Sequence, residues 1–236
     1  MKKKLRRIAV FPVPLAVQIA MGRVYALKNV RLFYKKKGRM KFISHLDMNR
    51  FFIRILRKSG IPIWYTEGFN PHPYITFAAP LSLGFESDYE IMDFRLTDDE
   101  FPLKKAEEIL KGVVPEYIEI IKISEPVMKA GKIGFAGFVL TFESQETAEL
   151  FEKFILSDTV TVSKKTKKGE IKVLDVKDKI NDVIRTDKKV SLILPAGNDN
   201  VNPSIIVSAF NEKAGKEYYV EYLRNALYNE EKKLFL

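Results

Sequence analysis

The stretch that decides the fold is MKFISHLDMNRFFIRILRKSGIPIWYTEGFNPHPYITFAAPLSLGFESDYEIMDF, residues 40–94. It holds both histidines of the chain, His45 and His72, and the single tryptophan, Trp64. A helical pattern comes first, a proline-rich loop follows, and strand patterns end the stretch. Because the histidines, the tryptophan and the proline-rich loop all lie here, any chemical site of the protein is expected in this block.

The first helix has clear start and stop signals. Ser44 followed by Asp47 stands in capping-box position, and Gly60 ends the pattern before Pro62, which predicts a helix over Ser44–Ser59. Its apolar residues recur at helical spacing and are expected to face the core; they are Met48, Phe51, Phe52, Ile55 and Leu56.

Strand patterns flank this helix. Alternating or continuous apolar residues predict strands at 29–34, 61–67, 75–81, 89–96 and 117–124. Pro102 opens a second amphipathic helix over about 103–113. The resulting order β-α-β-β-α-β, with a hairpin-like excursion after the second strand, is the ferredoxin-like split βαβ pattern.

The second half repeats this order more loosely. A strand and a helix (134–144 and 145–156) precede a hairpin around the Lys-rich turn KKTKKG (164–169), and Asn202 with Pro203 starts another helix. We predict an α+β protein of two tandem ferredoxin-like domains. The expected organisation is an extension over 1–27, weakly ordered, and domains over 28–130 and 131–236.

The N-terminal residues and the absence of cysteine bear on location. A basic segment and an apolar run resemble the start of a secretory signal, but Pro12 and Pro14 interrupt the run and it is too short to span a bilayer. With no cysteine, the chain has no disulfide, no thiol nucleophile and no cysteine-held zinc or iron–sulfur cluster. We expect a cytoplasmic protein without a membrane partner.

Charge is distributed unevenly along the chain. Residues 1–60 carry 17 Lys and Arg against one acidic residue, whereas the whole chain has a net charge of +10. Such asymmetry predicts a polyanion-binding end, most often for nucleic acid, although it also suits a basic face that serves solubility alone.

Phosphate binding is the site prediction that rests on most residues. The predicted RNA-binding side chains crowd one turn and one helix face; they are Lys35, Lys36, Lys37, Arg39, Lys41, Arg50, Arg54 and Arg57. The aromatic residues nearby are Trp64, Tyr65, Phe69, Tyr74 and Phe77. Basic groups interleaved with rings suit single-stranded RNA, whose bases stack on exposed aromatics, although most such rings are core residues.

His45 and His72 admit three roles. They are candidate catalytic residues, as general acid and base in metal-free RNA cleavage. They would also serve as metal ligands with Asp47, but helix capping explains Asp47 better, so no metal is predicted. In the structural alternative, His45 caps the helix and His72 braces the proline loop.

A shared pocket is predicted beside the first helix. His45 and His72 would meet there with the side chains of Asn49, Tyr65, Phe69, Asn70 and Pro71. Pro71 and Pro73 stiffen the GFNPHP loop, and a constrained loop often presents residues to a ligand.

Residues 30–96 resemble the signature of the radical-SAM-linked family, a bacterial domain of unknown function found alone or fused behind cobalamin-binding-type radical SAM proteins. The resemblance implies a radical SAM protein as partner. No CxxxCxxC motif or nucleotide-binding motif is present, so the chain itself is expected to carry no cofactor.

A more distant similarity is to the CRISPR repeat-processing endoribonucleases of the RAMP superfamily. The shared features are paired ferredoxin-like domains and a GF-x-P-x-P segment leading into a PL-x-x-G turn. In those nucleases a histidine near the first helix often serves in cleavage, and His45 is the matching position. PAGNDN, residues 195–200, is a poor match for their glycine-rich loop.

Together these observations predict an RNA-binding accessory protein, rather than an enzyme, that works with a radical SAM enzyme in tRNA or rRNA modification. The alternatives are a metal-independent endoribonuclease that uses His45 and a protein–protein scaffold without RNA.

Overall fold

A computed structural model describes residues 27–165 and 171–236. Its helices are α2 (His45–Ser59), α3 (Leu103–Val113), α4 (Gln145–Ile155) and α5 (Pro203–Ala214). Its strands are β1 (Lys28–Lys36), β2 (Ile75–Phe77), β3 (Phe85–Leu96), β4 (Ile118–Ser124), β5 (Ile133–Phe142), β6 (Thr161–Lys165), β7 (Ile171–Asp175), β8 (Asn181–Thr186), β9 (Lys189–Pro195) and β10 (Val220–Asn229). The predicted extension, up to residue 26, and most of the Lys-rich turn, residues 166–170, lie outside the described residues.

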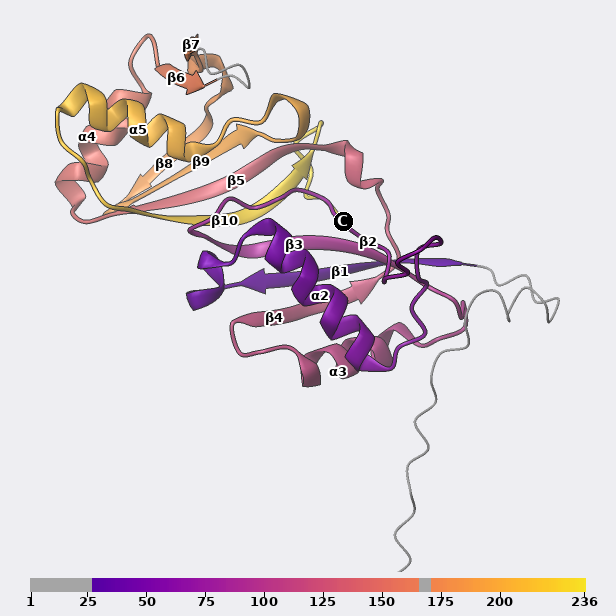
Figure 1. Ribbon diagram of the computed structural model, residues 1–236. Helices are drawn as coiled ribbons and strands as arrows, with labels where there is room; N and C mark the ends of the chain where they lie inside the picture. The colour runs from indigo at the N-terminus through magenta and orange to yellow at the C-terminus, as the bar shows by residue number, and fades with distance from the viewer. Residues whose placement is uncertain (1–26, 166–170) are drawn as a thin grey trace, which may run out of the picture.

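Strands from both halves of the chain form one sheet (Figure 1). Its order is β4-β1-β3-β10-β5-β9-β8, and β2 adds to β3. All neighbours are antiparallel except β3 and β10, which pair in parallel through Phe85–Ser87 and Tyr222–Arg224. The predicted α+β class is confirmed, and the β3–β10 pairing makes the two halves one mixed sheet.

Helix α2 forms where the capping signals predict it. The Ser44 side chain accepts a hydrogen bond from the Asp47 amide over 3.2 Å, and Gly60 adopts the left-handed conformation at the C-terminal end with φ +72°. Met48, Phe52 and Leu56 are buried, so the predicted apolar face is the packed face. This packing fixes which side of α2 remains in water.

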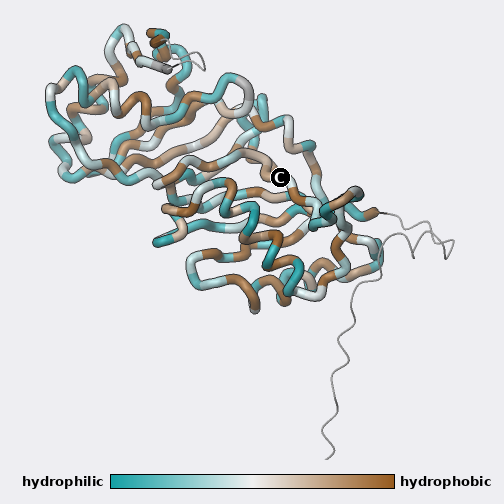
Figure 2. Tube along the Cα trace, viewed as in Figure 1, coloured by the Kyte–Doolittle hydropathy of each residue, from teal (hydrophilic) through white to brown (hydrophobic). Residues whose placement is uncertain are grey.

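Two hydrophobic cores lie on opposite faces of the sheet. Val30, Leu32 and Tyr34 of β1 pack with α2 and α3 in one core, whereas Phe33, whose side chain alternates to the other face, belongs to the core of β5, α4 and α5. Figure 2 shows the hydrophobic residues following the strands and the inner sides of the helices. The sheet is therefore covered on one face in its first half and on the other in its second.

Most predicted elements are confirmed, and two differ. Helix α3 covers residues 103–113 and α5 begins at Pro203, as predicted. The predicted strand over 61–67 is wrong, because it reduces to isolated bridges at Ile63 and Tyr65. Pro62 has no amide to donate at the start of this segment, and the residues after it pair only at separated points, such as Trp64 with Arg95 and Thr66 with His72. The strand predicted at 75–81 stops at Phe77.

The described residues include no helix that is long and apolar enough to cross a bilayer. The predicted domain boundary between residues 130 and 131 falls between β4 and β5, in the segment that links the two halves.

Candidate functional site

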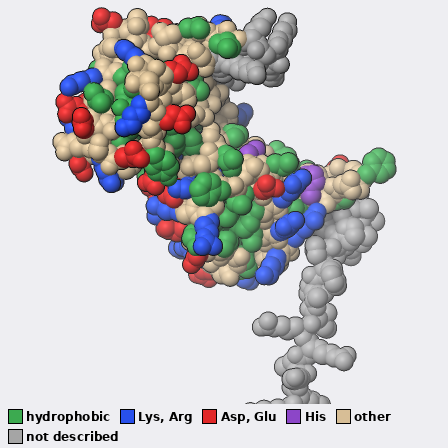
Figure 3. Space-filling model, turned by 60° about the vertical axis from the view of Figure 1, so that its left-hand side comes forward, with side chains coloured by type: hydrophobic (Ala, Val, Ile, Leu, Met, Phe, Trp, Pro, Cys, Tyr) green, Lys and Arg blue, Asp and Glu red, His purple; other side chains and the backbone are tan. Residues whose placement is uncertain are grey.

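The outer face of α2 carries free positive charge. Arg50, Arg54 and Arg57 are exposed along this face, as is Arg39 in the preceding turn, and Lys41 beside it is half-buried. Arg50 is partly neutralised by Asp47, whose carboxylate lies 3.1 Å from its Nη1. Figure 3 shows Lys and Arg side chains gathered over the half of the molecule that carries α2. We call Arg39, Lys41, Arg50, Arg54 and Arg57 the basic face.

The run of three lysines at residues 35–37 contributes less free positive charge than the sequence suggests. Lys35 pairs with Glu119 at 3.0 Å and Lys37 with Asp88 at 2.8 Å. The hydrogen bond to Asp88 raises the pKa of Lys37 above its ordinary value. Lys36 is 2% exposed and points into the protein. Of the predicted phosphate contacts, these three lysines are therefore neutralised or inaccessible.

The GFNPHP loop is closed by the Tyr65–Pro73 bridge and by a hydrogen bond from the Thr66 amide to the His72 carbonyl oxygen. His72 Nδ1 lies 3.0 Å from the Asn70 carbonyl oxygen and 3.2 Å from Thr66 Oγ1, and Arg57 donates to the Pro71 carbonyl oxygen over 3.1 Å. Phe69 at the tip is fully exposed. His72 thus braces the loop, as the structural alternative predicts, and the loop displays an aromatic ring beside the basic face.

His45 begins α2 and lies edge-on against Phe77, with ring centroids 5.0 Å apart. It lines a narrow pocket of about 10 Å³, the space of one water molecule. The other lining residues are Tyr34, Lys36, Met48, Phe77, Pro80, Leu81 and Glu90. The other residues of the predicted shared pocket, Asn49, Tyr65, Phe69, Asn70, Pro71 and His72, are not among them.

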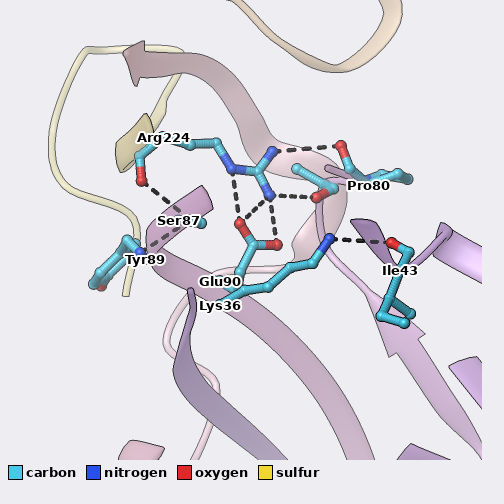
Figure 4. A network of polar contacts seen from close by, with 8 residues as sticks. Lys36, Ile43, Pro80, Ser87, Tyr89, Glu90 and Arg224 are labelled. Atoms are coloured by element: carbon cyan, nitrogen blue, oxygen red, sulfur yellow. Dashed lines mark hydrogen bonds and ion pairs between the residues drawn. The ribbon is translucent and has the colours of Figure 1, made fainter. Parts of the chain in front are cut away.

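A buried ion pair joins the two halves beside this pocket (Figure 4). Arg224 on β10 and Glu90 on β3 are each 4% exposed at the side chain. Arg224 Nε donates to Glu90 Oε1 over 3.0 Å, and Nη2 donates to Oε2 over 2.6 Å. The guanidinium also donates to the carbonyl oxygens of Ala79 at 2.7 Å and Pro80 at 3.4 Å, while Ser87 Oγ donates to the Arg224 carbonyl oxygen at 3.1 Å.

Lys36 and Tyr34 complete this polar cluster. The Lys36 ammonium donates to the Ile43 carbonyl oxygen over 3.2 Å. Burial lowers the pKa of Lys36, because desolvation disfavours the ammonium, and the Glu90 carboxylate opposes that shift. Burial also raises the pKa of Tyr34 well above its ordinary value. The ion pair fixes β3 to β10, and the Lys36 hydrogen bond fixes the end of β1 to the turn before α2.

Most of the predicted aromatic rings are already engaged by other side chains of the protein. Arg95 lies over Tyr74 at 4.5 Å and over Trp64 at 5.3 Å, which engages both rings in cation–π contacts. Tyr65 and Phe77 pack partly against the first core. Among the five predicted rings, Phe69 is the exposed one, and Phe42, 66% exposed, is a second ring that the sequence argument missed.

A larger cavity of about 300 Å³ lies where the two halves meet. The loop from Ala78 to Ser82 forms one wall, and the segment from Ala196 to Pro203 faces it. Asn202 Nδ2 donates to Ser82 Oγ over 2.8 Å and bridges the two walls. Arg224 lines this cavity as well, so the ion pair stands between it and the pocket at His45.

Arg224 and the lining of this cavity were not predicted as a site from the sequence. Strand alternation carried a partial signal, since it places Lys36 on the same face of β1 as Tyr34, and Glu90 on the same face of β3 as Met92. Within the described residues no three His, Cys, Asp or Glu side chains are arranged to hold a metal ion, so nothing supports the alternative of metal ligation by His45, Asp47 and His72.

The fold and the surface define an α+β protein with a basic helix face and a cavity between its two halves. The chain belongs to the DUF2344 family, described as uncharacterized proteins conserved in bacteria, whose family model matches residues 29–203. No curated protein matches the chain. The match spans the first half and continues through β9 to the start of α5.

Proposed function

We propose that this protein binds single-stranded RNA and acts as an accessory to a radical SAM enzyme, in tRNA or rRNA modification. The observation that carries the RNA-binding part is the basic face beside two exposed rings. Arg54 and Arg57 have no acidic partner among the described residues, and Phe42 and Phe69 are exposed near the two ends of α2.

This surface suits single strands for physical reasons. Arginines spaced along one helix face meet successive phosphates, and a guanidinium binds phosphate through two parallel hydrogen bonds. Exposed rings give unstacked bases a stacking surface that tolerates any sequence. Phe42 and Phe69 would give such a strand one exposed ring near each end of the row of arginines.

The geometry at the histidines favours an accessory role over a nuclease. The pocket at His45 has room for one water molecule, and His72 is engaged by its own loop. General acid–base cleavage needs a proton-transferring group within hydrogen-bond reach of the reacting atoms, and His72 does not line the pocket at His45. RNA cleavage in EDTA that disappears in His45→Ala would favour the nuclease instead.

We also propose that each half is a ferredoxin-like unit. The strand orders β4-β1-β3-β2 and β10-β5-β9-β8 have the same antiparallel pattern, and in each half the helices connect strands that are not neighbours. The β6–β7 hairpin is then an insertion after α4.

Binding is tested by filter-binding titration of a single-stranded RNA at several salt concentrations. If about five phosphates are contacted, the log–log slope of affinity against salt is expected at roughly −3 to −4. Arg50→Glu combined with Arg54→Glu should weaken binding of every sequence alike and flatten the slope. Lys188→Glu with Lys189→Glu, an equal charge change at an exposed turn of the second half, is the matched control.

The result that contradicts the proposal is equal affinity of the two double variants and the unaltered protein. The partner is tested separately. A radical SAM protein should co-purify with the tagged chain, and deletion of the gene should reduce one modified nucleoside in tRNA or rRNA. An unchanged nucleoside profile with no co-purifying radical SAM protein would contradict the partner proposal and leave RNA binding to be judged by the titration.

A further inference from the structure

The cavity between the two halves has the size and walls of a small-ligand site. Its volume of about 300 Å³ is at the lower end for ligand pockets, which favour junctions between structural units. Small residues keep it open, since Ala78, Ala136, Ala196 and Gly197 all line it. Larger side chains at these positions would fill it.

The floor of the cavity is aromatic. Phe85 is buried there and meets Phe138 edge-on, with ring centroids 6.3 Å apart. Behind it, Tyr222 stacks on Phe85 at 4.4 Å with an interplanar angle of 11°. Pro80 and Pro203 add rigid apolar wall. A flat apolar ligand face is complementary to such a floor.

Polar groups stand on one side of this apolar space. Arg224 lines the cavity, is 3% exposed as a residue, and carries five N–H donors. Its contacts with Glu90, Ala79 and Pro80 leave one Nη1 hydrogen without a protein acceptor in the described part of the chain. Exposed Asn200 adds a carboxamide at the cavity rim.

Charge decides which kind of ligand fits. The Glu90 carboxylate already balances the Arg224 guanidinium, so the lining offers no net positive charge to a phosphate. A neutral planar ring with donors and acceptors on one edge matches both the aromatic floor and the polar side. Carboxamides and arginine recognise the edges of unstacked bases in this way.

We propose that this cavity binds one unstacked nucleobase. The inference rests on the proposed RNA-binding function and deepens it, because it makes the cavity the base-reading site and the basic face the phosphate-binding site. The cavity adjoins the start of α2, since Pro80 and Leu81 line both the cavity and the pocket at His45. The same ring chemistry is supplied by a base in RNA or by a free nucleoside.

The experiment uses free nucleosides, which carry no phosphate and therefore do not engage the basic face. Adenosine, guanosine, cytidine and uridine are titrated separately into the full chain by isothermal titration calorimetry. We expect at least one to bind saturably, and Ala196→Phe, which fills the cavity from a half-buried position, to weaken that binding at least tenfold. Ala78→Phe fills it from the opposite wall, so a folding defect in one variant does not remove the test.

Arg50→Glu with Arg54→Glu is the control that separates the two proposals. Nucleoside binding that survives this double variant and is lost in Ala196→Phe or Ala78→Phe supports the cavity, even if RNA binding fails. The absence of nucleoside binding, or binding unchanged in both folded cavity variants, overturns the inference while RNA binding stands or falls by its own salt titration. A preserved RNA affinity of Ala196→Phe together with lost nucleoside binding assigns the cavity to free nucleosides rather than RNA.

Discussion

Removing the guanidinium of Arg224 is expected to cost more stability than any other single change at the junction. In Arg224→Met, Glu90 would stay buried without its partner, and the carbonyl oxygens of Ala79 and Pro80 would lose their donor. Breaking a buried pair by removing one partner typically costs about 3–5 kcal/mol. This is a large part of the roughly 5–15 kcal/mol that stabilises most domains.

The double variant Glu90→Leu with Arg224→Met isolates the reason for this loss. Replacing both charged groups by apolar ones removes the uncompensated charge, and such replacements are often neutral or stabilising by about 1–4 kcal/mol. We therefore expect the double variant to be more stable than Arg224→Met alone. The sign of that difference identifies the buried charge, rather than lost packing, as the source of the destabilisation.

The assay is urea unfolding followed by circular dichroism, with the slope of each transition compared between variants. Lys153→Met, which removes the exposed pair with Glu149 on α4, is the control and should leave the midpoint nearly unchanged. A loss below about 1 kcal/mol in Arg224→Met, well short of the usual cost of an unpaired buried charge, would refute the argument. It would mean that water reaches Glu90 and that the junction opens easily.

Three further predictions concern single positions. Gly60→Ala should destabilise the protein by about 1 kcal/mol because φ is +72° at this position. Gly112→Ala lies inside α3, where an added Cβ meets no neighbour, and should stabilise the protein by about 0.5–1 kcal/mol. Thermal unfolding compares the two variants. Lys36 binds its proton less tightly in the folded than in the unfolded chain, so the unaltered protein should gain stability relative to Lys36→Met as pH rises toward 10.5. Urea midpoints of both proteins across that pH range measure the difference in stability. A difference that stayed constant with pH would contradict the prediction. Burial raises the pKa of Tyr222 to about 12, so a difference absorbance titration against Tyr222→Phe should show one phenol ionising above the usual tyrosine range.

Local sequence signals were sufficient to predict where the helices begin and end. The ends of α2 depend on Ser44 and Gly60, and the start of α5 on Asn202 and Pro203, each of which acts within one turn of the chain. Alternating apolar residues likewise predicted a strand at 29–34, where β1 runs from Lys28 to Lys36. The prediction failed at residues 61–67, where apolar composition suggested a strand but Pro62 leaves no donor for continuous pairing.

The candidate site was harder to predict because it depends on distant pairs. Arg224 and Glu90 are 134 residues apart, and their contact requires the parallel β3–β10 pairing, for which no local pattern exists. The lysine run misled for a related reason. Lys35 and Lys37 look free in sequence, yet acidic residues of other strands neutralise them, whereas Arg54 and Arg57 have no acidic partner among the described residues.

The junction also limits how RNA would lie on the protein. Arg224 ties β10 to β3 and to the carbonyl oxygens of Ala79 and Pro80, so the loop that lines the cavity is bonded to strands of both halves. In the proposed binding mode, a strand that follows the arginines of α2 toward His45 would pass Phe77 and Pro80, since both line the pocket at His45 and Pro80 also lines the cavity. RNA loops and bulges carry unstacked bases that can be splayed out into a protein site, whereas paired segments do not. If the cavity holds one such base, we expect a looped RNA to bind more tightly than a fully paired duplex.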